Sequence, residues 1–184
     1  MVSIGILGLG NWGSAIAKMW LDDGHKIKGW TIESEVYESI TMENVNHKYL
    51  PKLSLKGMDV SMHIADTLDG VEVVVLAVPS SVILDVVDQV IPHLRPRHVI
   101  IDLAKGLAPG NQMISHAIQE KLAAAGIANP LAVVTGPTIA PEAAAGVMTT
   151  ALVASEDISV AIKLAKTLTT QTFILHPASD PIGA

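Results

Sequence analysis

The alternation of strand-like and helix-like segments along this chain of 184 residues predicts an α/β fold. We expect a doubly wound, mostly parallel sheet with helices on both faces, in which the last strands can be antiparallel. The apolar residues are aliphatic and only 3% of the chain is aromatic, which suits strands that are buried on both faces. The longest apolar runs, around residues 73–79, have the length of a strand.

The composition predicts one cytoplasmic domain without nucleic-acid or membrane partners. A net charge of -6 and the lack of a Lys and Arg cluster argue against a nucleic-acid surface. The chain has no cysteine, which excludes disulfides, a thiolate nucleophile and a cysteine-based zinc site. No apolar run reaches the roughly 20 residues of a membrane span. Nothing at the start of the chain has the pattern of a signal peptide.

The N-terminal stretch carries the clearest local pattern. Residues 2–7 are an expected strand, a turn with three glycines follows, and an amphipathic helix runs on to residue 21. Gly8 allows a tight turn, Gly10 lets a phosphate approach the backbone, and Gly13 lets the helix pack closely. Glycine-rich turns also occur in loops that bind nothing, but here a strand precedes the turn and a helix follows it. This context favours a Rossmann-type dinucleotide-binding fold, in which the N–H groups of the helix face a pyrophosphate.

The second expected strand, residues 26–30, leads to an acidic residue with two interpretations. In a dinucleotide-binding fold, an acid about 20 residues past the glycines pairs with the ribose 2′-hydroxyl, and Glu33 lies at that distance from Gly13. Glu33 can equally be an exposed acid at the start of a helix. In the first case its carboxylate would disfavour a 2′-phosphate, so NAD would be preferred over NADP.

The middle of the chain predicts several short elements and one clear strand. We expect a weak helix at residues 34–42, a loop at 43–58, a strand at 60–62 and a helical turn at 65–68. The clear strand, residues 72–78, ends at Pro79, and Ser80 or Ser81 is placed to cap the helix expected at residues 82–91. Capping alone is favoured over ligand contact for these serines. The two roles are compatible, because a loop at the carboxyl end of a parallel strand opens toward a ligand crevice.

The next expected strand, residues 98–103, places Lys105 at its carboxyl end. By spacing alone, this lysine is as compatible with a solubilising surface charge as with a site residue. The rest of the chain continues the alternation of strands and helices, and its last residues have the pattern expected at a domain boundary. We expect helices at residues 111–125 and 156–168, strands at 131–135, 149–154 and 172–175, and a tail without a closing element at 176–184.

Several common catalytic patterns are absent from the sequence. The seven histidines form no H-x-x-x-H or other close ligand pair, so no metal site is expected. The sequence also lacks the G-x-S-x-G turn of serine hydrolases and the G-x-x-x-x-G-K-[ST] phosphate loop. The glycine turn therefore remains the strongest indication of function.

Five segments, in order and at the right spacing, resemble the N-terminal domain of NAD(P)-dependent glycerol-3-phosphate dehydrogenases. They are residues 8–15 (GLGNWGSA), 46–51 (NHKYLP), 77–80 (AVPS), 105–107 (KGL) and 136–142 (GPTIAPE), with Thr150 and residues 154–155 beyond. The resemblance covers the whole chain, residues 1–184, as one dinucleotide-binding domain. It implies a reversible hydride transfer between NAD, with NADP left open, and carbon 2 of glycerol 3-phosphate. The product is dihydroxyacetone phosphate, and the pathway is phospholipid precursor synthesis in the cytoplasm.

The resemblance also implies roles for individual residues. Lys105 would reach both cofactor and substrate, where an ammonium stabilises a developing alkoxide. Gly136 and Thr138 would contact the substrate. The implied cofactor contacts are Gly8, Gly10, Asn11, Trp12, Gly13, Glu33, Pro79, Ser80, Lys105 and Ala140.

The chain departs from the family pattern in three ways. The family usually has a basic residue after the second strand, where this chain has Ile32 beside Glu33, and a phenylalanine where it has Ile139. The family's general-base lysine and its phosphate-binding arginine and asparagine lie in a helical C-terminal substrate domain, which is absent here. We therefore expect cofactor binding without turnover. We also expect a monomer, whereas the resemblance implies a homodimer, formed through that C-terminal half, for the full-length protein.

Two other functions remain open from the sequence. The missing catalytic half is compatible with a stand-alone NAD-binding or regulatory module. A related two-domain reductase, acting on another small hydroxy or keto acid, would share the same cofactor turn.

Overall fold

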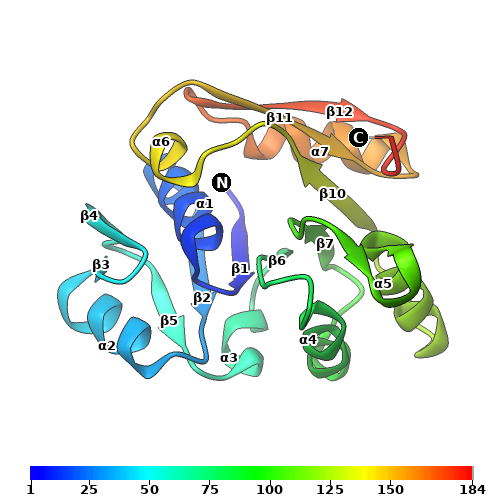
Figure 1. Cartoon of the computed structure of the whole chain (residues 1–184), viewed down its shortest axis with the longest axis horizontal. Helices are drawn as coiled ribbons and strands as arrows, with labels where there is room; N and C mark the ends of the chain where they lie inside the picture. Colours follow the sequence, from blue (N-terminus) through cyan, green and yellow to red (C-terminus); the bar gives the residue numbers. More distant parts are fainter. Residues whose placement is uncertain (184) are drawn as a thin grey trace.

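A computed structural model describes residues 1–183 and confirms the α/β fold (Figure 1). Its main sheet has the strand order β12-β11-β10-β7-β6-β1-β2-β5. The six strands from β10 to β5 are parallel to one another, β11 is antiparallel to β10, and β12 is parallel to β11. The strands are β1 (Ser3–Leu7), β2 (Lys26–Trp30), β5 (Asp59–Ser61), β6 (Val73–Leu76), β7 (Val99–Asp102), β10 (Leu131–Thr135), β11 (Thr149–Ala154) and β12 (Phe173–Ala178).

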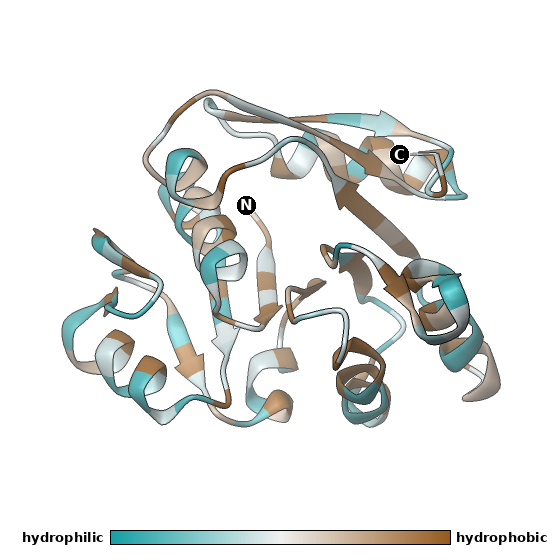
Figure 2. Ribbon diagram, in the orientation of Figure 1, coloured by the Kyte–Doolittle hydropathy of each residue, from teal (hydrophilic) through white to brown (hydrophobic). Residues whose placement is uncertain are grey.

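Helices cover both faces of this sheet, as expected for a doubly wound fold. Successive side chains of β6 enter two different buried clusters: Val73 and Val75 face one, Val74 and Leu76 the other. This explains why β6 is continuously aliphatic. Figure 2 shows a similar apolar stretch along β10. The first cluster lies under α1 (Asn11–Asp22), α2 (Ser34–Glu43), α6 (Ala140–Ala144) and α7 (Ile158–Leu168), and the second under α3 (Ile64–Leu68), α4 (Ile83–Val90) and α5 (Ile114–Ala124).

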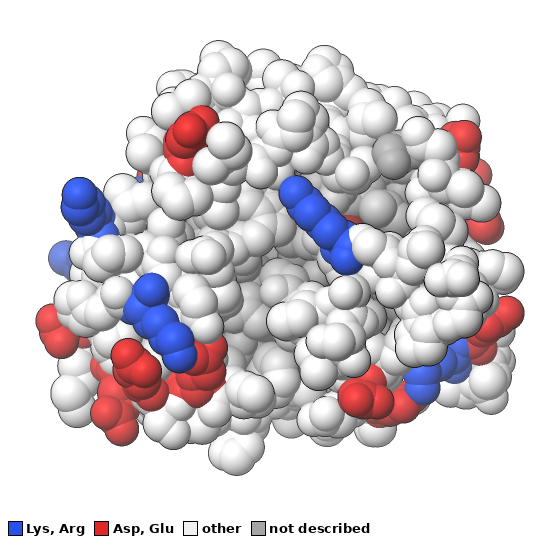
Figure 3. Space-filling model, in the orientation of Figure 1, with Lys and Arg blue, Asp and Glu red and all other residues white. Residues whose placement is uncertain are grey.

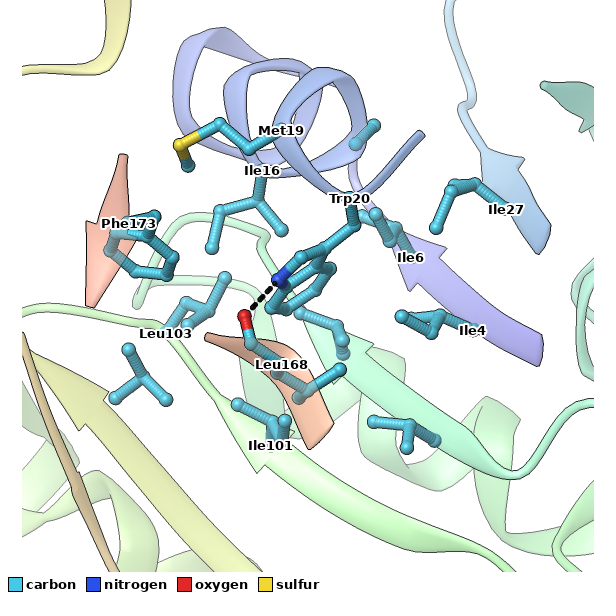
Figure 4. Close-up of a cluster of buried hydrophobic side chains, with 14 of the residues drawn as sticks. Ile4, Ile6, Ile16, Met19, Trp20, Ile27, Ile101, Leu103, Leu168 and Phe173 are labelled. Carbon is cyan, nitrogen blue, oxygen red and sulfur yellow. Dashed lines mark hydrogen bonds between the residues drawn. The ribbon is translucent and has the colours of Figure 1, made fainter. Parts of the chain in front are cut away.

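Trp20 of α1 connects the first and last parts of the chain. Its side chain is fully buried among Ile16, Ile101 and other aliphatic residues (Figure 4). The indole Nε1 donates a hydrogen bond of 3.0 Å to the carbonyl of Leu168, at the end of α7. The polar tip of this large side chain is thus satisfied within the core. The contact attaches the terminal β11–α7–β12 unit to the N-terminal half.

The structure contains two hairpins where the sequence predicts a loop and the start of a helix. Residues 43–58, expected to be a loop, contain the hairpin of β3 (Val45–Asn46) and β4 (Leu50–Ser54). The helix expected from residue 111 begins instead at Ile114, because β8 (Leu107–Ala108) and β9 (Gln112–Met113) form a second hairpin before it. Its turn, the 3-10 segment Pro109–Asn111, holds Gly110 and Asn111 at φ 81° and 60°, which glycine and asparagine tolerate best.

Three other local predictions are wrong. Neither Ser80 nor Ser81 caps α4: the N-cap position is Val82, with no side-chain cap, because the N–H of Val82 first bonds to the carbonyl of Pro79. Helix α1 starts three residues early, at Asn11. Strand β12 continues to Ala178, where the tail was expected to be open, because β11 provides a pairing partner up to Ala154. A 3-10 turn, Ile91–His93, follows α4.

Candidate functional site

A cavity of about 1070 Å³ opens where the parallel strands β1, β2, β6 and β7 end. It lies at the strand-order reversal, since the chain proceeds from β1 to β2 on one side and places β6 on the other. Figure 3 shows this face of the molecule hollowed near its middle, with a basic side chain at the rim. Lys105 is the one basic residue among the described residues that line the cavity.

The glycine turn between β1 and α1 forms one wall of the cavity. Gly8 has φ 104°, and a Cβ there would lie 2.7 Å from the carbonyl oxygen of Ala77, so only glycine fits. Gly10 is the N-cap of α1, has no side chain to cap the helix, and lines the cavity. A Cβ on Gly10 would meet no atom within 4 Å. The first N–H groups of α1 are thus left for an anionic ligand that approaches the open space at Gly10.

Gly13 lies behind this wall and does not line the cavity. A Cβ there would lie 1.9 Å from the carbonyl oxygen of Gly8 and 3.2 Å from the Cβ of Ala77. The first turn of α1 therefore lies directly against the end of β1. Gly13 shapes the turn from behind, which agrees with the close packing expected of it.

Trp12 lines the cavity and is held by the far end of the sheet. Its ring meets that of Phe173 on β12 edge to face, with centroids 6.3 Å apart and an interplanar angle of 81°. Such a pair limits the orientations of the indole. The terminal strand therefore supports the glycine turn, a connection that no local pattern indicates.

Asn46 ties the first hairpin to the glycine turn. It is fully buried, and its Nδ2 donates hydrogen bonds of 2.9 Å to the carbonyl of Leu9 and to Oγ of Ser14. Its Oδ1 accepts a bond of 3.2 Å from the N–H of Tyr49. One buried amide thus joins the turn, α1 and the hairpin. The sequence indicated Asn46 only through the 46–51 segment, because its role depends on docking across 37 residues.

Glu33 also lines the cavity, within a cluster of charged and polar groups. Its carboxylate accepts a hydrogen bond of 2.9 Å from the Tyr49 hydroxyl and is ion-paired with Lys48. Lys48 lowers the pKa of the Glu33 carboxyl, and the Tyr49 bond adds to this effect. Glu33 is also the N-cap of α2 but makes no side-chain cap. The structure therefore places Glu33 at the cavity and in the helix-start position at once.

Asp102 shapes the turn that presents Lys105. It ends β7, is 2% exposed, and its Oδ1 accepts a hydrogen bond of 2.8 Å from the N–H of Ala104. Burial raises the pKa of this carboxyl from 3.8 to about 6. The buried Asp102 carboxyl, with one backbone hydrogen-bond partner, thus lies three residues before the exposed Lys105.

The pH dependence of stability is expected to reveal Asp102. The folded chain binds more protons than the unfolded chain between the pKa values of 3.8 and about 6, so this contribution is full below 3.8 and is lost as pH rises through 6. Compared with Asp102→Asn, which keeps the acceptor, the wild-type free energy of unfolding should fall by about 3 kcal/mol between about pH 4 and pH 7. Urea titrations of both proteins at both pH values measure this difference. Parallel pH curves would contradict the assignment, and the exposed Asp59→Asn serves as control.

Most residues implied by the family resemblance converge on this one cavity. It is lined by Gly8, Gly10, Asn11, Trp12, Glu33, Pro79, Ser80, Lys105, Thr138 and Ala140. Gly13 and Gly136 do not line it. Gly136 lies against β11, and a Cβ added to Gly136 would lie 3.0 Å from the Cα of Ala151. Tyr49, indicated only as part of the 46–51 segment, also lines the cavity. Further lining residues that the sequence did not indicate include Thr31, Asp85 and Gln89. The last two lie on the cavity side of α4, where only packing determines which side chains face inward.

The described part of the chain holds neither a metal-binding cluster nor a membrane-spanning helix. No group of three or more His, Cys, Asp or Glu residues there could hold a metal ion. No helix among these residues is long and apolar enough to cross a membrane.

Comparison with known proteins decides the family. Residues 3–161 match the model of the NAD-dependent glycerol-3-phosphate dehydrogenase N-terminus. The chain belongs to this family. The match confirms the resemblance seen in the five segments, and it favours that interpretation over a regulatory module or another reductase.

Individual relatives agree. The glycerol-3-phosphate dehydrogenase [NAD(P)+] of Syntrophotalea carbinolica is 32% identical over 184 residues, covering 99% of this chain and 55% of the relative. That of Corynebacterium urealyticum is 31% identical, covering 100% and 55%. The crystal structure of the Coxiella burnetii glycerol-3-phosphate dehydrogenase superposes with a TM-score of 0.88 at 29% identity, over 97% of this chain and 54% of that one. The chain thus spans about half the length of its relatives.

Proposed function

We propose that this chain is the cofactor-binding half of an NAD(P)-dependent glycerol-3-phosphate dehydrogenase. The observation that carries the proposal is the uncapped N-terminus of α1, which faces a cavity of about 1070 Å³ beside the open space at Gly10. The cavity is large enough for a dinucleotide, and the glycine turn has the shape that a pyrophosphate needs.

The residues present fit each part of the cofactor. The α1 N-terminus, with Asn11 and Trp12, would hold the pyrophosphate and neighbouring groups, and Glu33 would lie by the adenosine ribose. Pro79, Ser80 and Ala140 would complete the walls. When bound, the nicotinamide supplies or accepts the hydride.

Lys105 would act on the substrate at the nicotinamide end. The exposed Lys105 lines the cavity, and its ammonium would stabilise negative charge on the oxygen at carbon 2; Thr138, which also lines the cavity, would contact the substrate. The proton-transferring base and the phosphate site would come from a second, C-terminal domain, which would also form the dimer. This chain alone would be monomeric and would bind cofactor without turnover. We place the whole enzyme in cytoplasmic phospholipid precursor synthesis.

Titration with NADH tests the cofactor site. We expect quenching of tryptophan fluorescence with saturation below about millimolar concentration, because Trp12 and Trp30 line the cavity. No binding at millimolar NADH would overturn the proposal.

Substrate assignment needs the second domain. Joined to the C-terminal half of the Syntrophotalea carbinolica relative, the chain should reduce dihydroxyacetone phosphate. Lys105→Met, which keeps the side-chain length without the charge, should lower kcat by about a hundredfold or more. Activity only with a different ketone would refute glycerol 3-phosphate as the substrate.

A further inference from the structure

Beside the cavity, next to Glu33, lies a cation that the glycine turn does not predict. Lys48 lies in the turn between β3 and β4, and its Nζ is ion-paired with Glu33 and lies 3.9 Å from the Glu35 carboxylate. It also lies 5.5 Å from the centroid of the Tyr49 ring. Over α2 and this hairpin, Figure 3 shows acidic side chains gathered around a basic one.

The hydrogen bonds of Asn46 hold the hairpin that carries Lys48, while the Lys48 ammonium remains accessible. Asn46, buried and bonded to Leu9 and Ser14, fixes the hairpin against the glycine turn. The Lys48 side chain is nevertheless 41% exposed, and its partner Glu33 lines the cavity. A group bound beside the Glu33 carboxylate would therefore be within reach of this ammonium.

We propose that Lys48 is the residue through which this cavity accepts a 2′-phosphorylated adenosine, with Glu33 opposing it. The inference rests on the proposed cofactor site. A carboxylate at the end of β2 binds the ribose 2′-hydroxyl but repels a phosphate there. Lys48 neutralises that carboxylate when the 2′-hydroxyl is free, and it exchanges this partner for the phosphate when one is present.

Local charges predict the direction of the preference. Glu33 and Glu35 together outnumber Lys48, so the cluster carries a net negative charge. The wild-type chain should bind NAD more tightly than NADP but should accept both. This differs from the sequence argument, in which the Glu33 carboxylate acts alone against NADP.

Calorimetric titration with 5′-AMP and 2′,5′-ADP tests the proposal, because these probes differ only by the 2′-phosphate. Glu33→Gln should strengthen binding of 2′,5′-ADP about tenfold, and Lys48→Met should weaken it about tenfold. Binding of 5′-AMP should change by less than about threefold in Lys48→Met. In the double variant, the gain from Glu33→Gln should disappear. Lys52→Met removes an exposed charge from the same hairpin and should change neither affinity.

The outcomes separate this proposal from the cofactor site itself. If Lys48→Met weakens both probes equally or neither, or if the double variant keeps the gain, the role of Lys48 is overturned while the cofactor site stands. If the wild-type chain binds neither probe nor NADH, the cofactor site fails and the Lys48 proposal with it. Circular dichroism of each variant checks that the fold is intact.

Discussion

Replacing Gly13 with alanine is expected to abolish dinucleotide binding and to destabilise the fold. The new Cβ would lie 1.9 Å from the carbonyl oxygen of Gly8, so the first turn of α1 must move away from the end of β1. Overpacking at a backbone contact of this kind should cost about 3 kcal/mol or more of unfolding free energy. The displaced helix N-terminus should reduce NADH affinity by about a hundredfold or more. Urea unfolding and fluorescence titration measure the two effects.

Gly10→Ala is the matched control for this prediction. Gly10 has φ -72°, which alanine adopts without strain, and its added Cβ would meet nothing within 4 Å. Stability should therefore stay within about 0.5 kcal/mol of the wild type. NADH affinity should fall, because the methyl group occupies space that the phosphates need. Equal loss of stability in both variants would contradict the distinct roles of the two glycines.

Replacing Asn46 with alanine should produce the second largest effect. The substitution removes the two Nδ2 donations and the acceptor of the Tyr49 N–H, and it leaves a cavity at a fully buried site. We expect a loss of about 2–4 kcal/mol in unfolding free energy. The hairpin should also detach from the glycine turn, so NADH binding should weaken together with stability.

Two measurements check this interpretation of Asn46. Thermal unfolding gives the stability loss, and hydrogen exchange across residues 44–55 shows whether the hairpin opens locally. Lys52→Ala, on the exposed side of the same hairpin, should leave both unchanged. A normal melting transition and normal exchange in Asn46→Ala would rule out the role of Asn46 in holding the hairpin against the glycine turn.

The buried strands were the most predictable part of the fold. The bounds expected for β10 and β11 agree with the structure, because apolar runs of strand length are bounded there by turn formers. The first hairpin was not predictable in this way. Its strands have two and five residues, several of them exposed. Asn46 of β3 holds them in place through its hydrogen bond to the carbonyl of Leu9, which no local apolar pattern indicates. Likewise, no local feature shows that Val82 rather than a serine occupies the N-cap of α4.

The sequence by itself determined the glycine turn, the succession of the main-sheet strands along the chain and, through five short segments, the family. These features depend on backbone freedom, local apolar periodicity and residue motifs, whereas α6 and the two hairpins were not predicted. Only the tertiary structure decided that Trp12 is supported by Phe173 and that Glu33 meets Lys48 and Tyr49. Those contacts join residues that are 15 or more positions apart, and they form only after the hairpin and the last strand have docked. Hydrogen bonds and ion pairs act over a few ångströms, so the electrostatic character of the cofactor site is a property of the packed chain.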